Sequence, residues 1–293
     1  MIDSVLRRRL VGLLLPVFLL GVLCLAACGL GGPQSHVPTA AEILQRATNV
    51  LNVNNPTSAQ GANSATVQDL TYTLKLTVNM DMSDSSLGAQ KLSETITATG
   101  EETLKPRRSQ ADMTMALADA SLPQNFNLTD TIIVDYASQT GYIKMSGGML
   151  PGAASGKWYK MSFASVGGLG ADTSMYVDYS KLKDAKLIGS ETINGVAVWH
   201  LRAKEDLSQA VPGSTLTGSG SSTGASNSVS GTATLDYYFR QDNYRPVKIG
   251  MAGNETMSDL GTATTTGEMD FTAFNTGVSI GLPPANEVSP LQF

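Results

Sequence analysis

Apolar and polar residues alternate along much of the chain, and an alternation of period two is typical of a half-buried β-strand. In residues 70–80, leucine, tyrosine, valine and methionine occupy the even positions, while threonine, lysine and asparagine occupy the odd ones. Weaker alternation or short apolar runs predict further strands at residues 92–104, 113–117, 132–136, 142–145, 158–163, 186–191, 196–203, 234–240, 246–252, 264–274 and 278–281. The pattern therefore predicts a chain rich in strands.

Turn-forming residues separate several of these strands. Asn194-Gly195 stands between two of them, and Asn-Gly is the strongest short-range signal for a β-hairpin. Asp242-Asn243 is expected to form the turn of a second hairpin, and Pro283-Pro284 is expected to end the sheet. Short connections of this kind join neighbouring antiparallel strands.

Residues 39–51 carry the period of an amphipathic helix instead. Thr39 and Glu42 have the spacing of a capping box, in which each side chain bonds the other residue's backbone N–H. The apolar residues then fall on one helical face: Ile43, Leu44, Ala47, Val50 and Leu51. Residues 175–183 fit a short helix about as well as a loop, and a short helix is expected there.

This order of elements predicts an α+β fold in which a large curved antiparallel sheet wraps around the amino-terminal helix. Long helices do not alternate with the strands, which argues against a parallel, doubly wound sheet. Residues 204–230 are rich in serine, threonine and glycine, so we expect a long low-complexity loop between two strands.

The first 28 residues have the layout of a lipoprotein leader. Three arginines at residues 7–9 precede an apolar run at 10–23, and Leu25-Ala26-Ala27-Cys28 follows as a lipobox. The apolar run is shorter than the roughly 20 residues of a membrane-spanning helix. This resemblance to bacterial lipoproteins implies cleavage before Cys28 and a diacylglycerol on its sulfur, whose two acyl chains suffice for stable attachment. An ordinary signal peptide or an uncut anchor is the alternative.

The expected organisation is a signal peptide at 1–27, a lipidated flexible tether at 28–38, and one domain at 39–287. The protein is expected on the extracytoplasmic face of the cell membrane, anchored by its lipid. Cys24 and Cys28 are the only cysteines, so a disulfide within the domain is excluded. The net charge of −5 argues against a nucleic-acid partner, since nucleic-acid binding requires basic clusters.

Motifs of enzymes and cofactor sites are missing from the sequence. Only His36, in the tether, and His200, in a predicted strand, could serve as a catalytic histidine, and His200 is interpreted as an ordinary strand residue. Nucleophile-elbow, phosphate-loop and zinc-binding patterns do not occur. The acidic groups read as solvated strand ends or turns: Glu101-Glu102, Glu191, Glu205-Asp206 and residues 268–270. We expect no catalysis, no cofactor and no metal.

Several of the 12 methionines fall on strand segments, where they alternate with threonine or serine. Methionine is flexible and polarizable, so it suits surfaces that accept apolar partners of varied shape, although it also fills ordinary cores. Strand phase gives these candidates for the lining of an apolar, lipid-binding cavity: Leu74, Leu76, Val78, Met113, Met115, Met145, Met161, Tyr238, Ile249, Met251 and Phe271.

Four segments together with the lipobox resemble the LppX/LprG-type lipoproteins, a family related in fold to the lipoprotein carriers of the Lol system. They are residues 41–47 of the helix, 189–201 around Asn194-Gly195, 236–239 and 245–248. The resemblance implies a half-open β-barrel closed by helices, with a cavity that binds lipids or lipidated molecules for carriage in the envelope. An envelope transporter is then a further candidate partner. The alternative is a non-catalytic envelope sensor or scaffold that binds a protein partner.

Overall fold

The computed structural model describes residues 36–51, 66–84, 88–119, 126–146, 156–162, 179, 182, 184–206, 229–257 and 261–290. The chain divides into two units, residues 1–38 and 39–293, and every helix and strand named below belongs to the second unit. The predicted leader, Cys28, most of the predicted helix at 175–183 and residues 207–228 lie outside the described residues.

Helix α2 (Ala40–Leu51) confirms the predicted amphipathic helix. The Thr39 backbone N–H donates to Glu42 Oε2 at 2.7 Å, and the Glu42 N–H donates to Thr39 Oγ1 at 3.2 Å, so the capping box forms. The helix's buried side chains are those of the predicted apolar face: Ile43, Leu44, Ala47, Val50 and Leu51. Local sequence thus determines both the start of this helix and the face that it buries.

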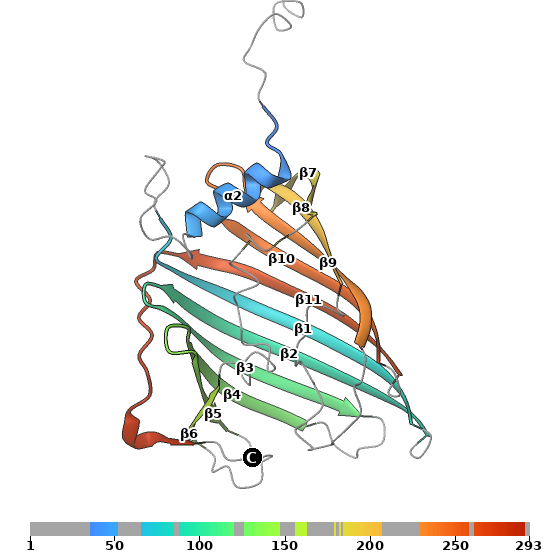
Figure 1. Ribbon diagram of the computed structural model, residues 1–293, viewed down its shortest axis with the longest axis vertical. Helices are drawn as coiled ribbons and strands as arrows, with labels where there is room; N and C mark the ends of the chain where they lie inside the picture. The colour runs from blue at the N-terminus through green and yellow to red at the C-terminus, as the bar shows by residue number, and fades with distance from the viewer. Residues whose placement is uncertain are drawn as a thin grey trace, which may run out of the picture. The chain divides into compact units, whose positions relative to one another are not determined.

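Twelve strands form one sheet (Figure 1). They are β1 (Asp69–Asp84), β2 (Gly88–Leu104), β3 (Arg107–Asp119), β4 (Phe126–Asp135), β5 (Thr140–Met145), β6 (Trp158–Ser162), β7 (Lys186–Ile193), β8 (Val196–Asp206), β9 (Val229–Arg240), β10 (Pro246–Met257), β11 (Gly261–Phe274) and β12 (Val288–Pro290). A short 3₁₀ helix, η2 (Ala285–Glu287), precedes β12. The spatial order is β12-β6-β5-β4-β3-β2-β1-β11-β10-β9-β8-β7. The large curved sheet of the sequence prediction is confirmed.

The sheet consists of two antiparallel meanders, β1 to β6 and β7 to β11, which meet where β1 pairs with β11. In that pairing Leu74 lies opposite Met269 and Val78 lies opposite Thr265. The β7–β8 hairpin turns at Asn194 and Gly195, whose φ angles of 50° and 79° are those that a tight hairpin turn requires. Strands β8 and β9 reach into the segment 204–230, to Asp206 and from Val229.

The strand predicted at residues 278–281 is wrong. This segment has no strand structure; instead, Ile280 is buried and its carbonyl accepts a hydrogen bond from Arg108 Nη1 at 3.1 Å. The final strand is β12, which pairs in parallel with β6, so the sheet is not wholly antiparallel. Figure 1 shows the chain passing from β11 to η2 beside the ends of the other strands.

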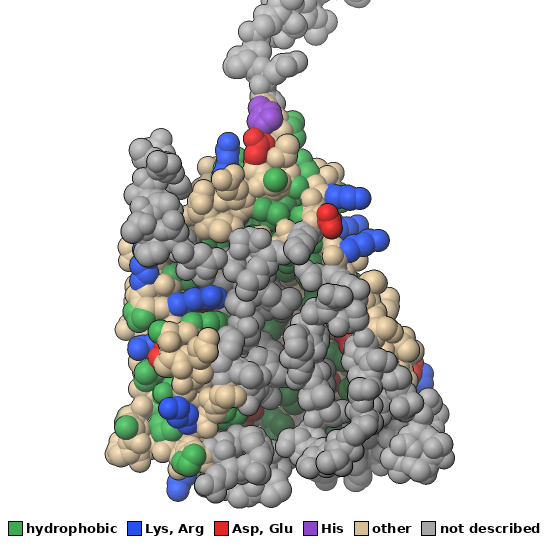
Figure 2. Space-filling view, in the orientation of Figure 1, with side chains coloured by type: hydrophobic (Ala, Val, Ile, Leu, Met, Phe, Trp, Pro, Cys, Tyr) green, Lys and Arg blue, Asp and Glu red, His purple; other side chains and the backbone are tan. Residues whose placement is uncertain are grey.

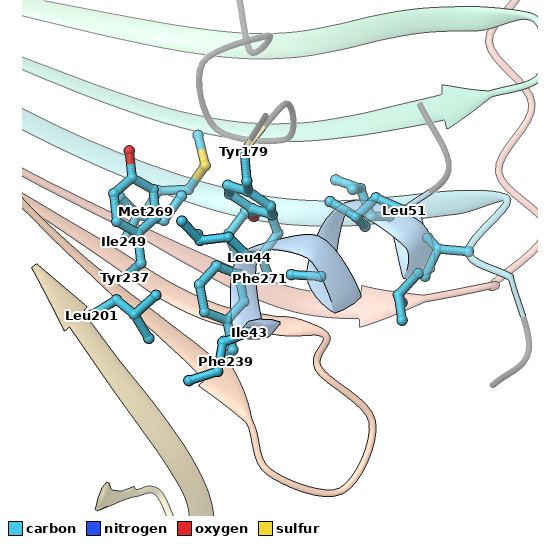
Figure 3. Packing of buried hydrophobic residues seen from close by; sticks show 14 of the residues in the cluster. Ile43, Leu44, Leu51, Tyr179, Leu201, Tyr237, Phe239, Ile249, Met269 and Phe271 are labelled. Atoms are coloured by element: carbon cyan, nitrogen blue, oxygen red, sulfur yellow. The ribbon is translucent and has the colours of Figure 1, made fainter. Parts of the chain in front are cut away.

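Buried apolar side chains form two clusters. The helix-side cluster joins α2 to β1 and to β8–β11, and its largest members include Ile43, Leu51, Tyr179, Tyr237 and Phe239. Figure 3 shows Ile43 and Leu44 of the helix lying beside aromatic residues of the sheet. The strand-side cluster contains Ile96, Ala98, Met113, Ile132, Val134, Ile143, Met145 and Tyr159. No helix within the described ranges is long and apolar enough to cross a membrane.

Candidate functional site

The strands β1 to β4 have one apolar face and one face rich in threonine. Register places Leu74, Ala98, Met113 and Asp130 side by side across these four strands, and the first three belong to the apolar clusters or pack on them. We call this side the apolar face. The opposite side, the threonine face, carries Thr73, Thr97, Thr99, Asp112, Thr114 and Thr129, which with Leu74 and Ala98 line a pocket of ≈ 460 Å³.

Charged side chains on the visible surface of the described residues are dispersed rather than gathered into one patch (Figure 2). On the threonine face, Thr131 Oγ1 donates to Asp112 Oδ1 at 2.7 Å, so this carboxylate already has a partner. The distinguishing property of the sheet is therefore the contrast between its two faces.

Ten of the eleven residues predicted to line a cavity lie on the apolar face. Val78 is buried in the same strand phase as Leu74 and Leu76, and the others belong to the two clusters or pack against them: Leu74, Leu76, Met113, Met115, Met145, Met161, Ile249, Met251 and Phe271. The strand phases thus bring together side chains from β1, β3, β5, β6, β10 and β11. Contact of these residues with a ligand stays a prediction.

The phase assigned to Tyr238 is wrong. Tyr237 and Phe239, its neighbours in β9, are buried in the helix-side cluster, so Tyr238 lies on the other face of the strand. Its ring stacks on the ring of His200, with centroids 4.5 Å apart. Because residues 237–239 are all aromatic, they show no alternation from which the phase could be read.

The two clusters differ in what packs on the sheet. In the helix-side cluster, α2 contributes its whole apolar face. In the strand-side cluster, the described members come from β1 to β6 and the β4–β5 turn, and no described helix packs on them. Leu74 packs against both clusters, so the apolar face is continuous between them.

Two carboxyl groups interrupt the strand-side part of the apolar face. Glu94 is 5% exposed and lies between Val78 of β1 and Leu117 of β3. Asp130 lies between Met113 of β3 and Met145 of β5. Burial raises the pKa of Glu94; it also raises the pKa of Asp130, where a hydrogen bond from the Ser146 backbone partly offsets the effect. Neither carboxyl group is marked by a sequence motif.

A third carboxyl group, that of Glu102, is completely buried, so its interpretation as a solvated strand end is wrong. Arg107 Nε donates to Glu102 Oε1 at 2.9 Å. The Tyr179 hydroxyl lies near this pair; burial raises its pKa well above the ordinary value of 10.0, with further contributions from Tyr237 and Glu102. The alternation of the strand could have predicted that Glu102 is buried, because Glu102 follows Ile96 and Ala98 at an even number of residues.

On the other side of the sheet, His200 lies between two carboxylates. Its Nδ1 is 2.5 Å from Glu191 Oε1, and its Nε2 is 2.6 Å from Asp236 Oδ1. Arg202 also donates to Asp236, from Nε at 2.7 Å and from Nη2 at 3.1 Å. Burial alone raises the pKa of Asp236, but the hydrogen bonds from Arg202 and His200 lower it below its usual value. This network joins β7, β8 and β9 by side-chain contacts.

Among the described residues, no three His, Cys, Asp or Glu side chains are placed to hold a metal ion. The arrangement that the sheet does provide is an extended apolar surface with methionines and isolated carboxyl groups. Contact with apolar side chains of this kind removes apolar groups from water without any covalent chemistry.

Comparison with known proteins finds likenesses in structure only. No family model matches the sequence, and no curated protein matches it. Solved structures of LppX/LprG-type mycobacterial lipoproteins are similar to this chain. LprF from Mycobacterium bovis has 12% identity and a TM-score of 0.41, with 84% of this chain and 98% of LprF covered.

The lipoprotein LppX from Mycobacterium tuberculosis has 12% identity and a TM-score of 0.37, with 83% of this chain and 100% of LppX covered. A β-barrel-like protein of unknown function from Brucella abortus has 10% identity and a TM-score of 0.26, with 71% and 100% covered.

Proposed function

We propose that this protein is a membrane-anchored extracytoplasmic lipoprotein that binds lipids or lipidated molecules on the apolar face of its sheet and carries them in the cell envelope. The observation that carries the proposal is the strand-side cluster. Its apolar side chains extend over six adjacent strands, and no described helix packs on them. These side chains are buried, so in this proposal an acyl chain inserts among them.

Burial of acyl chains provides the free energy of binding, at about 0.8 kcal/mol for each methylene removed from water. The four methionines of this region, Met113, Met115, Met145 and Met161, line adjacent parts of the same face. Unbranched, polarizable side chains adjust to chains of different length and unsaturation. The site is therefore suited to a class of acylated ligands rather than to one rigid molecule.

In this proposal α2 closes one end of the binding face, because it covers the helix-side cluster and leaves the strand-side cluster to the ligand. Lipidation at Cys28 holds the domain at the membrane, and residues 28–38 serve as its tether. Two acyl chains on one cysteine suffice for stable anchoring. The bilayer that holds the protein is then also a source or acceptor of its ligand.

The test uses the mature chain, residues 28–293, with Cys28→Ala so that no anchor is attached. After delipidation, the protein is titrated with a fluorescent fatty acid, and lipids that co-purify with the native protein are identified by mass spectrometry. Saturable uptake and co-purified lipid are expected. Absence of both would overturn the proposal and favour the sensor or scaffold alternative.

A further inference from the structure

Within the described residues, the apolar face carries two carboxyl groups that form no ion pair, those of Glu94 and Asp130. Glu94 is 5% exposed, and burial raises the pKa of its carboxyl group. The Asp130 carboxyl group accepts a hydrogen bond from the Ser146 backbone, but its Oδ1 atom is buried and has no hydrogen-bond partner. A buried polar atom without a partner is costly, and burial of a carboxyl group disfavours its charge, so carboxyl groups in these positions on an apolar face require an explanation.

We propose that Glu94 and Asp130 are the polar contacts of the bound lipid and accept hydrogen bonds from hydroxyl or ammonium groups that the lipid carries. This inference rests on the proposed function and specifies its ligand class: acyl lipids with hydrogen-bond donors, in preference to lipids that have only acceptors. A donor from the ligand would supply the partner that Asp130 Oδ1 lacks.

The surroundings of the two carboxyl groups fit this assignment. Each lies between apolar neighbours in the sheet, Glu94 beside Val78 and Leu117, and Asp130 beside two methionines that we place in the ligand site. A ligand whose acyl chain covers these neighbours necessarily passes over a carboxyl group. Desolvation by the ligand then strengthens any hydrogen bond that its polar groups make there.

The two groups are separate contact points rather than one acidic cluster. They flank β3 on opposite sides, and their partners on β3, Leu117 and Met113, are four residues apart, or about 13 Å at the usual strand rise. One small headgroup therefore cannot touch both. Each carboxyl group meets its own donor, at a different distance along the bound lipid.

The test compares three probes with the same C18 chain: oleyl alcohol, oleylamine and methyl oleate, which has no donor. Affinities for the mature Cys28→Ala chain are measured by displacement of a fluorescent fatty acid. We expect the alcohol and the amine to bind about threefold to tenfold more tightly than the ester, the effect of one net hydrogen bond. Glu94→Leu and Asp130→Leu should each reduce this preference, and together they should abolish it while ester binding remains.

The matched control is Glu101→Leu, because Glu101 belongs to the same strand as Glu94 but to the opposite phase. It should leave the preference intact. Glu94→Gln preserves the size of the side chain and one acceptor oxygen but removes the negative charge. It should therefore reduce the preference for the amine more than the preference for the alcohol. Because glutamine is so similar in size, this variant also tests the assignment if the leucine variant misfolds. Equal affinity of all three probes for the protein without these substitutions would overturn this assignment. So would a preference for the alcohol and the amine over the ester that survives both leucine substitutions. Failure of every probe to bind would overturn the proposed function itself.

Discussion

Arg107 donates from Nε to Glu102 Oε1 at 2.9 Å, across the turn that joins β2 to β3. The Glu102 side chain is fully buried, whereas the Arg107 side chain is 19% exposed, and the guanidinium carbon lies 4.0 Å from the centroid of the Tyr136 ring. The arginine therefore neutralises a carboxylate that the fold buries completely.

Arg107→Ala should lower the free energy of unfolding by about 3 kcal/mol, because it removes the cation that pairs with the fully buried Glu102 carboxylate. Urea titration at neutral pH measures the change. Lys91→Ala is the matched control, since Lys91 and Asp81 form an ion pair at 3.4 Å with side chains 83% and 64% exposed. Exposed pairs contribute about 0–1 kcal/mol. Equal costs for the two substitutions would contradict the role given to Glu102.

Asp236 should make the stability of the protein fall in acid. Its hydrogen bonds from Arg202 and His200 hold its pKa below the usual 3.8, so the folded state favours the carboxylate. This contribution is present above the usual pKa and is lost as the pH falls through the lower folded-state value. The midpoint of urea unfolding is measured at a series of pH values from neutral to acid. As the pH falls below the usual pKa of aspartate, the midpoint should decrease less steeply for Asp236→Asn than for the parent protein.

Asp242→Asn is the control for that titration. Arg240 lowers the pKa of Asp242 through a hydrogen bond as well, but the Asp242 side chain is 60% exposed and solvent screens the pair. Its substitution should change the acid profile less than Asp236→Asn does. The reverse ranking would show that the His200 network is not coupled to folding.

Thr39→Ala should destabilise the protein by about 1 kcal/mol, since it removes the acceptor of the Glu42 N–H and half of the capping box. Thermal or urea unfolding detects this loss, and Gln45→Ala, at an exposed position in the same helix, should leave stability nearly unchanged. If Thr39→Ala were neutral, packing alone would be sufficient to start the helix at this residue.

Gly100→Ala should cost about 1–3 kcal/mol, because a Cβ atom there would stand 2.2 Å from Cζ of the buried Tyr72 ring. The comparison is Gly189→Ala in β7, where nothing lies within 4 Å of the added methyl group. Unfolding of both variants in urea separates steric overlap from a general effect of replacing glycine in a strand.

Met115→Lys should reduce uptake of the fluorescent fatty acid by at least about tenfold, since it places a charge on the apolar face where acyl chains are proposed to bind. Thr114→Lys is the neighbouring control on the threonine face and should bind normally. Circular dichroism of both variants checks that they fold. A similar loss in both would argue that the apolar face is not the binding surface.

Local signals in the sequence were enough to predict the helix, the Asn194-Gly195 turn and most strands. These features depend on residues close together in the chain, such as Thr39 with Glu42 or Leu74 with Leu76. The pairing of β12 with β6 could not be predicted, because three residues ending in Pro290 are too few to show an alternation. Its parallel direction follows from the path of residues 275–287 rather than from the strand itself.

The candidate site was predicted in its apolar part and missed in its polar part. Methionine and leucine in strand phase indicated the apolar face, but acidic residues were interpreted by type, which favours solvent, rather than by phase. Glu94 and Glu102 share their phase with Ile96 and Ala98, so phase alone places them inside. The contacts of His200 could not be inferred, since Glu191 and Asp236 reach it through the registers of two hairpins.

The pairing of β1 with β11 also has a consequence for biogenesis. The two strands pair over their length, from Leu70 opposite Phe274 to Met82 opposite Gly261. Almost the entire domain separates them in the sequence. Contacts so distant in sequence form late and slow the folding of β proteins. In the proposed export, which begins at the amino terminus, the β1 edge stays exposed until the last long strand has crossed the membrane. The first meander would then have to resist aggregation, or be protected by a chaperone, for most of that export.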